Sequence, residues 1–234
     1  KFAASRMVCV IAPPPTVPCV VPDNTLTRME NVQNATIDFE GRRDVHVGKG
    51  TFVMCPALES LTVVSLGDGV TLADEFVSSN RALRRIEISP CARRGIRAIG
   101  TNVFAHNLQL TEIDLSGLTE LTSIGDGFLS LSPELRHLRM NNLPRLTTVG
   151  DRFIGLNTAL EVFEWAGWGT LAATGRTFLS HARALRRIDF SGAVSLQSIG
   201  DDSLIHCNQL ECVEGLPALR QLRRLGSDFL LHAK

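Results

Sequence analysis

Histidine and cysteine are side chains that could hold a zinc ion. His181 and His206 lie 25 residues apart, and Cys207 follows the second of them. Imidazole and thiolate groups are ligands that zinc prefers, so the three residues could form part of a zinc site. The spacing supplies no further ligand of fixed geometry, and the same positions also suit partly buried, stacked side chains. We therefore predict no metal site and no cofactor.

Motifs that organise catalytic side chains are missing. The sequence contains no nucleophile elbow, phosphate-binding loop, HExxH metal motif or dinucleotide-binding fingerprint. Serine, histidine and aspartate all occur, but no spacing brings them together as nucleophilic catalysis requires. We predict that the protein is not an enzyme, with no catalytic residues and no small-molecule substrate.

The cysteines and one sequon bear on the compartment. Six cysteines stand at positions 9, 19, 55, 91, 207 and 212 without a CxxC pair, which leaves the redox environment open. Cys207 fits a structural role, and a Cys207–Cys212 disulfide is the alternative. Asn34-Ala35-Thr36 is a glycosylation sequon, so Asn34 is a candidate modification site if the chain enters a secretory pathway.

The charge balance bears on the class of partner. Lysine plus arginine and aspartate plus glutamate both number 24, which disfavours nucleic acid because phosphate binding needs an excess of cations. Local basic patches stay open at Arg93, Arg94, Arg220, Arg223 and Arg224. No stretch reaches the roughly 20 apolar residues that cross a bilayer, so we predict no membrane span.

The elements that position all these residues come from an internal repeat. Blocks of 25 residues follow one another without a gap from Leu110, and their first residues are Leu110, Leu135, Leu160, Leu185 and Leu210. Upstream, units of 24, 25 and 27 residues begin at positions 34, 58 and 83. We therefore predict two regions, an N-terminal tail or irregular cap over 1–33 and a solenoid over 34–234. The last unit ends without a cap, so we expect the array to continue or be capped outside this sequence.

Each unit reads approximately LxxIxLxxLxxLxxIGDxFL, with the alternation of a strand at I-x-L. A 25-residue period is that of leucine-rich repeats and is too short for helix-pair repeats. The recurring glycines, such as Gly125, should mark corners where neighbouring coils approach closely, and the phenylalanines that follow, such as Phe128, should stack in a column. In the same frame Trp165 and Trp168 fall at core positions.

The repeats predict a strand-rich α/β solenoid. We expect a right-handed leucine-rich-repeat horseshoe of about eight coils, with a parallel sheet on its concave face. The column three residues before each leading leucine should satisfy backbone groups inside a turn. Its members are Cys55, Asn80, Asn107, Ser132, Asn157, Ala182, Cys207 and His232.

The segments LTSIGDGFLSLSPEL and LQSIGDDSLIHCNQL, with Cys55 and Cys207 three residues before a leading leucine, resemble the BspA-like class of leucine-rich repeats. That class occurs in surface proteins of bacteria and protists. The resemblance covers about 200 residues and implies roles in adhesion and protein recognition, and a cell-surface or secreted location. An intracellular location stays open.

Function should lie on the residues that alternate with the core positions of each strand. They form a row of mostly acidic residues flanked by a row of mixed charge, which predicts a protein partner carrying basic groups. The alternatives are that these charges only pair with each other, or that the array is a structural spacer or an adhesin unit. The candidate residues on the concave face are Arg85, Glu87, Glu112, Asp114, His137, Arg139, Glu164, Arg187, Asp189 and Glu214.

Overall fold

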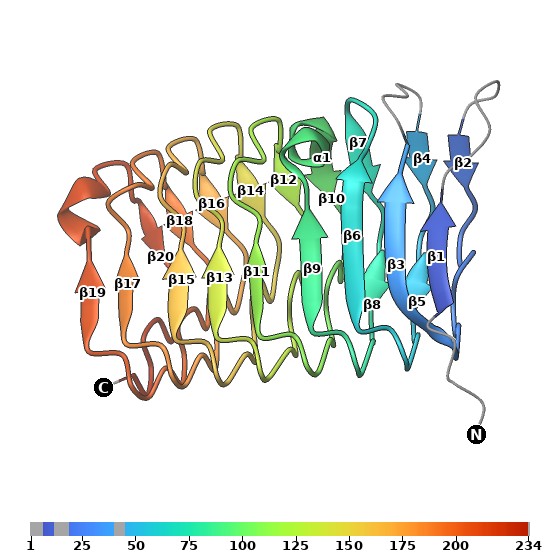
Figure 1. The fold of residues 1–234 in the computed structure, drawn as a ribbon. Coiled ribbons are helices and arrows are strands. Elements are labelled where there is room, and N and C mark those ends of the chain that lie inside the picture. Colours follow the sequence, from blue (N-terminus) through green and yellow to red (C-terminus); the bar gives the residue numbers. More distant parts are fainter. Residues whose placement is uncertain (1–6, 12–18, 40–44, 234) are drawn as a thin grey trace.

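The computed structural model describes residues 7–11, 19–39 and 45–233 and is a parallel β-solenoid (Figure 1). Each coil places one strand on the front face as drawn and a second strand on the back face. All pairings between strands are parallel, because every coil repeats the course of the previous one. A third side, below the two faces, closes each coil.

The front strands form three sheets rather than one. The first has the order β1-β3-β6-β9, the second β11-β13-β15 and the third β17-β19. Their bounds are Met7–Ile11, Val32–Asp38, Ser60–Ser65 and Arg85–Ile88; Glu112–Asp114, His137–Arg139 and Val162–Glu164; Arg187–Asp189 and Cys212–Glu214.

The back strands form a continuous nine-stranded sheet of order β2-β4-β7-β10-β12-β14-β16-β18-β20. Their bounds are Cys19–Val21, Val45–Val47, Val70–Leu72, Ile96–Ile99, Ser123–Ile124, Thr148–Val149, Ala173–Thr174, Ser198–Ile199 and Arg224–Leu225. On the third side, β5 (Phe52–Val53) pairs with β8 (Val77–Ser78). Helix is confined, within the described residues, to α1 (Pro90–Gly95) and the 3₁₀ turn η1 (Leu216–Ala218).

Several finer expectations are not confirmed. The described chain has little helix, so the α/β class and the curved horseshoe with a concave sheet are not supported, and nine strands rather than eight stack in the back sheet. The additional layer arises upstream of residue 34, where β1 pairs with β3 and β2 pairs with β4. The proline-rich segment 12–18 of the predicted tail or cap lies outside the described residues.

The apolar positions of the repeat fill the space between the faces. Leu115 and Ile188 are at most 1% exposed, and Phe128, Phe153 and Phe178 are fully buried. The three phenylalanine rings stack at centroid distances of 5.4 and 5.5 Å, which confirms the predicted column. Burial of these side chains is the main stabilising contribution, at about 25 cal/mol per Å² of apolar surface.

The two tryptophans are core residues, as predicted. Trp168 is fully buried, and its Nε1 donates to the carbonyl oxygen of Met140 at 2.6 Å. Trp165 is 4% exposed and its ring contacts that of Phe190 in the next coil, with centroids 5.1 Å apart. Neither side chain is available for surface recognition.

The glycine corners are also confirmed. A Cβ atom on Gly175 would lie 2.4 Å from the carbonyl carbon of Gly150, so a side chain would clash with the previous coil. The aspartate after the corner glycine has a matching role: Asp126 Oδ1 accepts the amide of Asp151, and Asp151 Oδ1 accepts the amide of Arg176, each at 2.8 Å. The Gly-Asp pair of the repeat thus joins consecutive coils.

The third side has an unusual backbone. In the coil from Leu110, Gly127, Leu129 and Leu131 have φ values of 64°, 52° and 58°, and the same alternation recurs in later coils. For a residue with a side chain, this left-handed conformation costs roughly 1–2 kcal/mol. The alternation turns successive amides toward opposite neighbours: Leu129 donates to Val103 of the previous coil and Leu131 to Gly155 of the next. These inter-coil hydrogen bonds offset the cost.

Asn80, Asn107, Asn157 and Cys207 of the polar column satisfy the backbone of this turn, as predicted, whereas Ser132 Oγ has no partner in the described chain. Asn157 Oδ1 accepts the amide of Ser132 at 2.8 Å, and its Nδ2 donates to the carbonyl of Leu129 at 2.8 Å. Cys207 Sγ donates to the carbonyl of Leu179 at 3.3 Å, and burial raises the pKa of this thiol to about 11. The alternative Cys207–Cys212 disulfide is absent, since both cysteines are free.

Candidate partner-binding site

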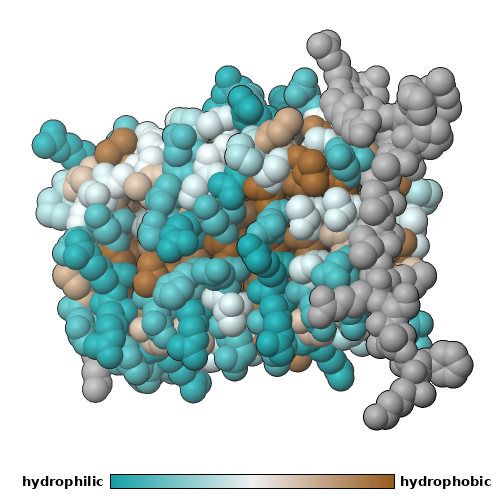
Figure 2. All heavy atoms as spheres, viewed as in Figure 1, coloured by the Kyte–Doolittle hydropathy of each residue, from teal (hydrophilic) through white to brown (hydrophobic). Residues whose placement is uncertain are grey.

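The candidate residues share one face of the molecule. All of them lie on the six front strands from β9 to β19. Asp114, Arg139 and Glu164 are in register across β11, β13 and β15, so the predicted row exists in space. In Figure 2 polar side chains cover most of this face, with hydrophobic residues visible between them.

Many of the charges on this face are paired with each other. Arg139 Nε lies 3.3 Å from Glu164 Oε1 on the next strand. Arg85 pairs with Glu87, and Arg187 with Glu214. Such exposed pairs contribute about 0–1 kcal/mol each. These contacts are those expected if the charges on this face pair with each other. They also reduce the number of carboxylates that a partner could bind.

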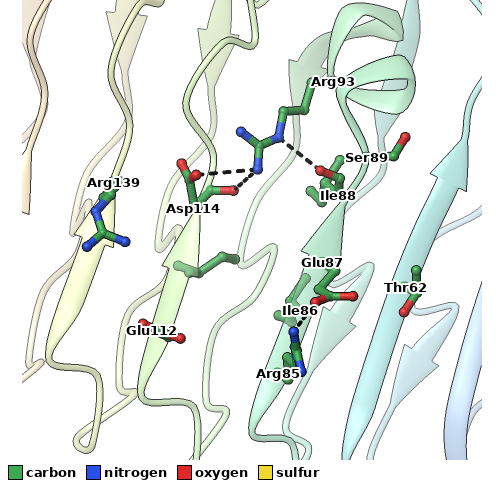
Figure 3. Close-up of a pocket in the computed structure, with 11 residues that line it drawn as sticks. Thr62, Arg85, Ile86, Glu87, Ile88, Ser89, Arg93, Glu112, Asp114 and Arg139 are labelled. Carbon is green, nitrogen blue, oxygen red and sulfur yellow. Dashed lines mark hydrogen bonds and ion pairs between the residues drawn. The ribbon is translucent and has the colours of Figure 1, made fainter.

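A groove lies where the first front sheet ends. β9 is the edge of the four-stranded sheet and β11 the edge of the next one. The groove between them has a volume of about 420 Å³. Figure 3 shows its charged side chains on both sides of the gap. Those that belong to the predicted set are Arg85, Glu87, Glu112, Asp114 and Arg139.

Arg93 bridges this gap. Its Nε donates to the carbonyl of Ile88 on β9 at 2.9 Å, and its Nη2 donates to the carbonyl of Asp114 at 2.9 Å (Figure 3). Its Nη1 donates to the carbonyl of Ser116 at 2.7 Å. A guanidinium suits this position because its donors form a rigid fork. Arg93 Nη2 also lies 3.6 Å from Asp114 Oδ2.

Helix α1 holds Arg93 in place. Ser89 caps the helix by accepting the amide of Ala92 at 3.1 Å, and Pro90 follows with a φ suited to the first helical turn. Sequence reasoning placed Arg93 in a possible nucleic-acid patch and missed its bridging role. The two-residue insertion in this unit, where the helix forms, is the sequence feature that could have indicated this role.

Two carboxylates of β11 have different environments. Asp114 Oδ1 accepts the amide of Ser116 at 2.9 Å. Burial opposes ionisation of Asp114, but this hydrogen bond and the nearby Arg93 and Arg139 outweigh it and hold its pKa below the ordinary value. Glu112 is exposed and has no ion pair within the described part of the chain. Glu112 is therefore the free acidic group of the groove.

A second groove lies at the next gap, between β15 and β17. Its lining includes Glu164, Asp189 and Asn141. Asn141 Nδ2 donates to Glu164 Oε2 at 2.9 Å, and Asp189 Oδ1 accepts the amide of Ser191 at 2.8 Å. Glu164 is thus oriented by the preceding coil, and Asp189 by its own. Behind them, Trp165 fills the gap from the core side.

Three of the histidines stack on one another along the last three coils. The rings of His181 and His206 have centroids 4.7 Å apart, and those of His206 and His232 are 4.8 Å apart. Over the described residues, no cluster of three or more histidine, cysteine or acidic side chains could hold a metal ion. His232 therefore belongs to the column of His206, not to the polar column in which the sequence frame placed it, because the last unit has one extra residue before Gly226.

The remaining predicted features are placed as follows. Asn34 lies on β3, partly buried, and its Oδ1 accepts a hydrogen bond from Ser60 Oγ at 2.6 Å. Its glycosylation stays a prediction. In the described part of the chain, no helix has the length and apolar character needed to cross a membrane.

Comparisons with known proteins assign no family. No family model matches the chain, and no curated protein matches it. A leucine-rich repeat protein from Bacteroides ovatus is similar in structure, with 14% sequence identity and a TM-score of 0.45, over 94% of this chain and 71% of that chain. At this level of similarity it carries no argument about fold or function here.

Proposed function

We propose that the chain is a non-enzymatic protein-recognition scaffold of the BspA-like class, which binds a basic side chain of a partner in the groove between β9 and β11. A rigid parallel stack is consistent with an interaction scaffold, because it presents fixed rows of side chains over a long surface. The groove is an open surface feature and not an enclosed pocket, which suits recognition better than catalysis.

The observation that carries the proposal is the unpaired carboxylate of Glu112 beside a set of paired charges. Arg85 neutralises Glu87 and Arg93 neutralises Asp114, so these acids are already satisfied. A lysine or arginine of a partner would therefore pair with Glu112. An acidic group of a partner would instead be repelled by Glu112, which contributes specificity.

The test is an affinity capture from the source cells with the wild-type chain, Glu112→Lys and the control Glu134→Lys, read by quantitative mass spectrometry. Glu134 is also exposed but lies outside the front strands, so the control makes the same charge change elsewhere. We expect one or more proteins to be retained by the control and lost from Glu112→Lys. Loss from both variants, or from neither, would contradict binding in the groove.

A spacer or adhesin unit that acts through its length is the second candidate. The continuous back sheet favours it, because nine strands joined along the whole described array make a stiff rod. Deletion of the unit 135–159 would then impair function while Glu112→Lys would not. The two results separate recognition by the front face from a structural role.

A further inference from the structure

A third groove runs along the third side, away from the front face. Its floor is made by the residue that follows the middle left-handed residue of each coil, which is Ser130, Gly155 or Ser180 in three successive coils. Leu131, Leu156 and His181 form one wall. Asn102, Arg152 and Thr177 form the other. The volume of the groove is about 470 Å³.

The groove exists because of side-chain size. The equivalent positions in the next two coils are Ile205 and Leu231, whose large side chains would fill the floor. Gly155 has no side chain to fill the floor, and a Cβ atom there would lie 3.3 Å from Ser180 Oγ. The backbone therefore accepts large residues at this place, and the small ones keep the groove open over part of the array.

Two hydroxyl groups on the floor have no use in the fold. Ser130 and Ser180 are 6% and 4% exposed, and both line the groove. Within the described residues, neither hydroxyl oxygen takes part in a hydrogen bond, and neither is sealed off from the groove. Because both oxygens face the groove and make no hydrogen bond within the fold, a ligand in the groove could hydrogen-bond to them.

The side chains of the walls indicate which other groups a ligand should carry. Leu131 and Leu156 are each 38% exposed, which is high for two leucines side by side on consecutive coils. Arg152 is exposed on the opposite wall and makes no ion pair in the described chain. The neighbouring Arg176 differs, because it pairs with Asp201 and Asp202. An occupant should therefore offer apolar groups to the leucines and a carboxylate to Arg152.

We propose that this groove binds an extended peptide segment of a partner protein, with apolar side chains against Leu131 and Leu156 and an acidic side chain at Arg152. Four coils spaced about 4.8 Å apart give a length of roughly 14 Å, which accommodates about four extended residues. A peptide suits the floor better than an acyl chain, because its backbone amides and carbonyls can hydrogen-bond to the two serine hydroxyls. Methylene groups would leave the hydroxyls unpaired.

The experiment uses a phage-displayed library of random heptapeptides, selected on the wild-type chain, on Gly155→Ile and on Gln197→Leu. Gly155→Ile fills the groove with a residue that Ile205 already shows to be compatible with this position. Gln197→Leu adds apolar bulk on the exposed back face as the control. We expect peptides with an acidic residue beside apolar ones to be enriched on the wild type and the control, but not on Gly155→Ile.

A selected peptide, labelled with a fluorophore, then gives affinities by anisotropy. We expect Gly155→Ile to weaken binding by at least about tenfold. Ser130→Ala and Ser180→Ala should each weaken it by about threefold to tenfold while leaving the melting temperature unchanged or higher, because the hydroxyls stabilise nothing in the free protein. Arg152→Glu should shift the selection toward basic peptides.

The proposal is overturned if no peptide is enriched, or if the same peptides bind Gly155→Ile with unchanged affinity. It is also overturned if Glu112→Lys, rather than Gly155→Ile, abolishes binding, since the peptide would then occupy the front groove. That last outcome would support the proposed function while removing this inference, so the two failures are distinguishable.

Discussion

The front sheets open at two places, and the two gaps are closed in different ways. Between β9 and β11, the guanidinium of Arg93 reaches carbonyls on both sides of the gap. Between β15 and β17, the aromatic rings of Trp165 and Phe190 meet behind the gap. Hydrogen-bond donors at the surface close the first gap, and packed aromatic side chains in the core close the second.

The difference shows how each closure shapes the surface above it. Arg93 forms an ion pair with Asp114, so Glu112 is the acidic residue of the first groove that has no ion pair in the described chain. The aromatic closure supplies no surface cation, and Trp165 Nε1 is itself a buried donor without a partner in the described chain. We expect the first gap to lose stability when a polar group is removed, and the second to respond mainly to changes in packing.

The largest expected effect is common to both gaps, because the aliphatic core continues behind each. Leu115→Ala next to the first gap and Ile188→Ala next to the second should each lower the free energy of unfolding by about 2 to 5 kcal/mol. Chemical denaturation followed by circular dichroism measures it, with exposed Val194→Ala as the control. A near-zero cost at one gap only would mean that its core is not continuous with the rest.

Arg93→Ala tests the polar closure. It removes three hydrogen bonds to carbonyl groups and should cost about 2 kcal/mol, since bonds from a charged donor are stronger than neutral ones. Arg94→Ala is the matched control, because Arg94 is exposed on the same helix. Hydrogen exchange of the β9 and β11 amides should increase in Arg93→Ala. Equal effects of the two variants would refute the bridging role.

The two tryptophans test the aromatic closure. Trp168→Phe removes the donor to the Met140 carbonyl and should cost about 1 to 2 kcal/mol. Trp165→Phe keeps a smaller ring in the gap and removes an indole N–H that has no partner in the described chain, so it should cost about 1 kcal/mol from lost packing alone, less than Trp168→Phe. Thermal denaturation separates the two, and a larger cost for Trp165→Phe would contradict this account.

The smallest effect on stability should come from a histidine on the third side, away from both gaps. Burial, His206 and Arg183 lower the pKa of His181, so between that lowered pKa and about 6.5 the unfolded chain binds the extra proton. Stability should therefore decrease as the pH falls below about 6.5. His181→Asn should reduce this slope in urea titrations across pH 5–8, whereas His137→Asn on the front face should leave it. An unchanged slope in His181→Asn would remove His181 as the cause.

The sequence predicted the parts of the fold that repeat. The period placed Leu115, Phe128 and Trp168 in the core and aligned Asp114 with Arg139, because these positions depend only on the 25-residue register. It could not predict the left-handed backbone at Ile154, with φ of 56°, since glycine and asparagine are the usual signals of that conformation.

The candidate site was predictable only in part. Register placed the acidic row on one face, but side-chain pairing decides which acids stay free, and Arg93 reaches Asp114 from an inserted helix that has no counterpart in other units. The groove on the third side depends on the small floor residues and on hydroxyls whose lack of partners is visible only once the coils are stacked. Both grooves arise where the sequence departs from its own repeat.

The corner aspartates have a consequence for how such an array can change its length. Asp126 accepts a backbone amide of the next coil, and a backbone amide is the same whichever residue carries it. If recombination removed the unit 135–159, Asp126 would meet the amide of Arg176 in place of that of Asp151, and Gly175 would meet Gly125. Gain or loss of a whole unit therefore regenerates the joint between coils without any new compatible mutation.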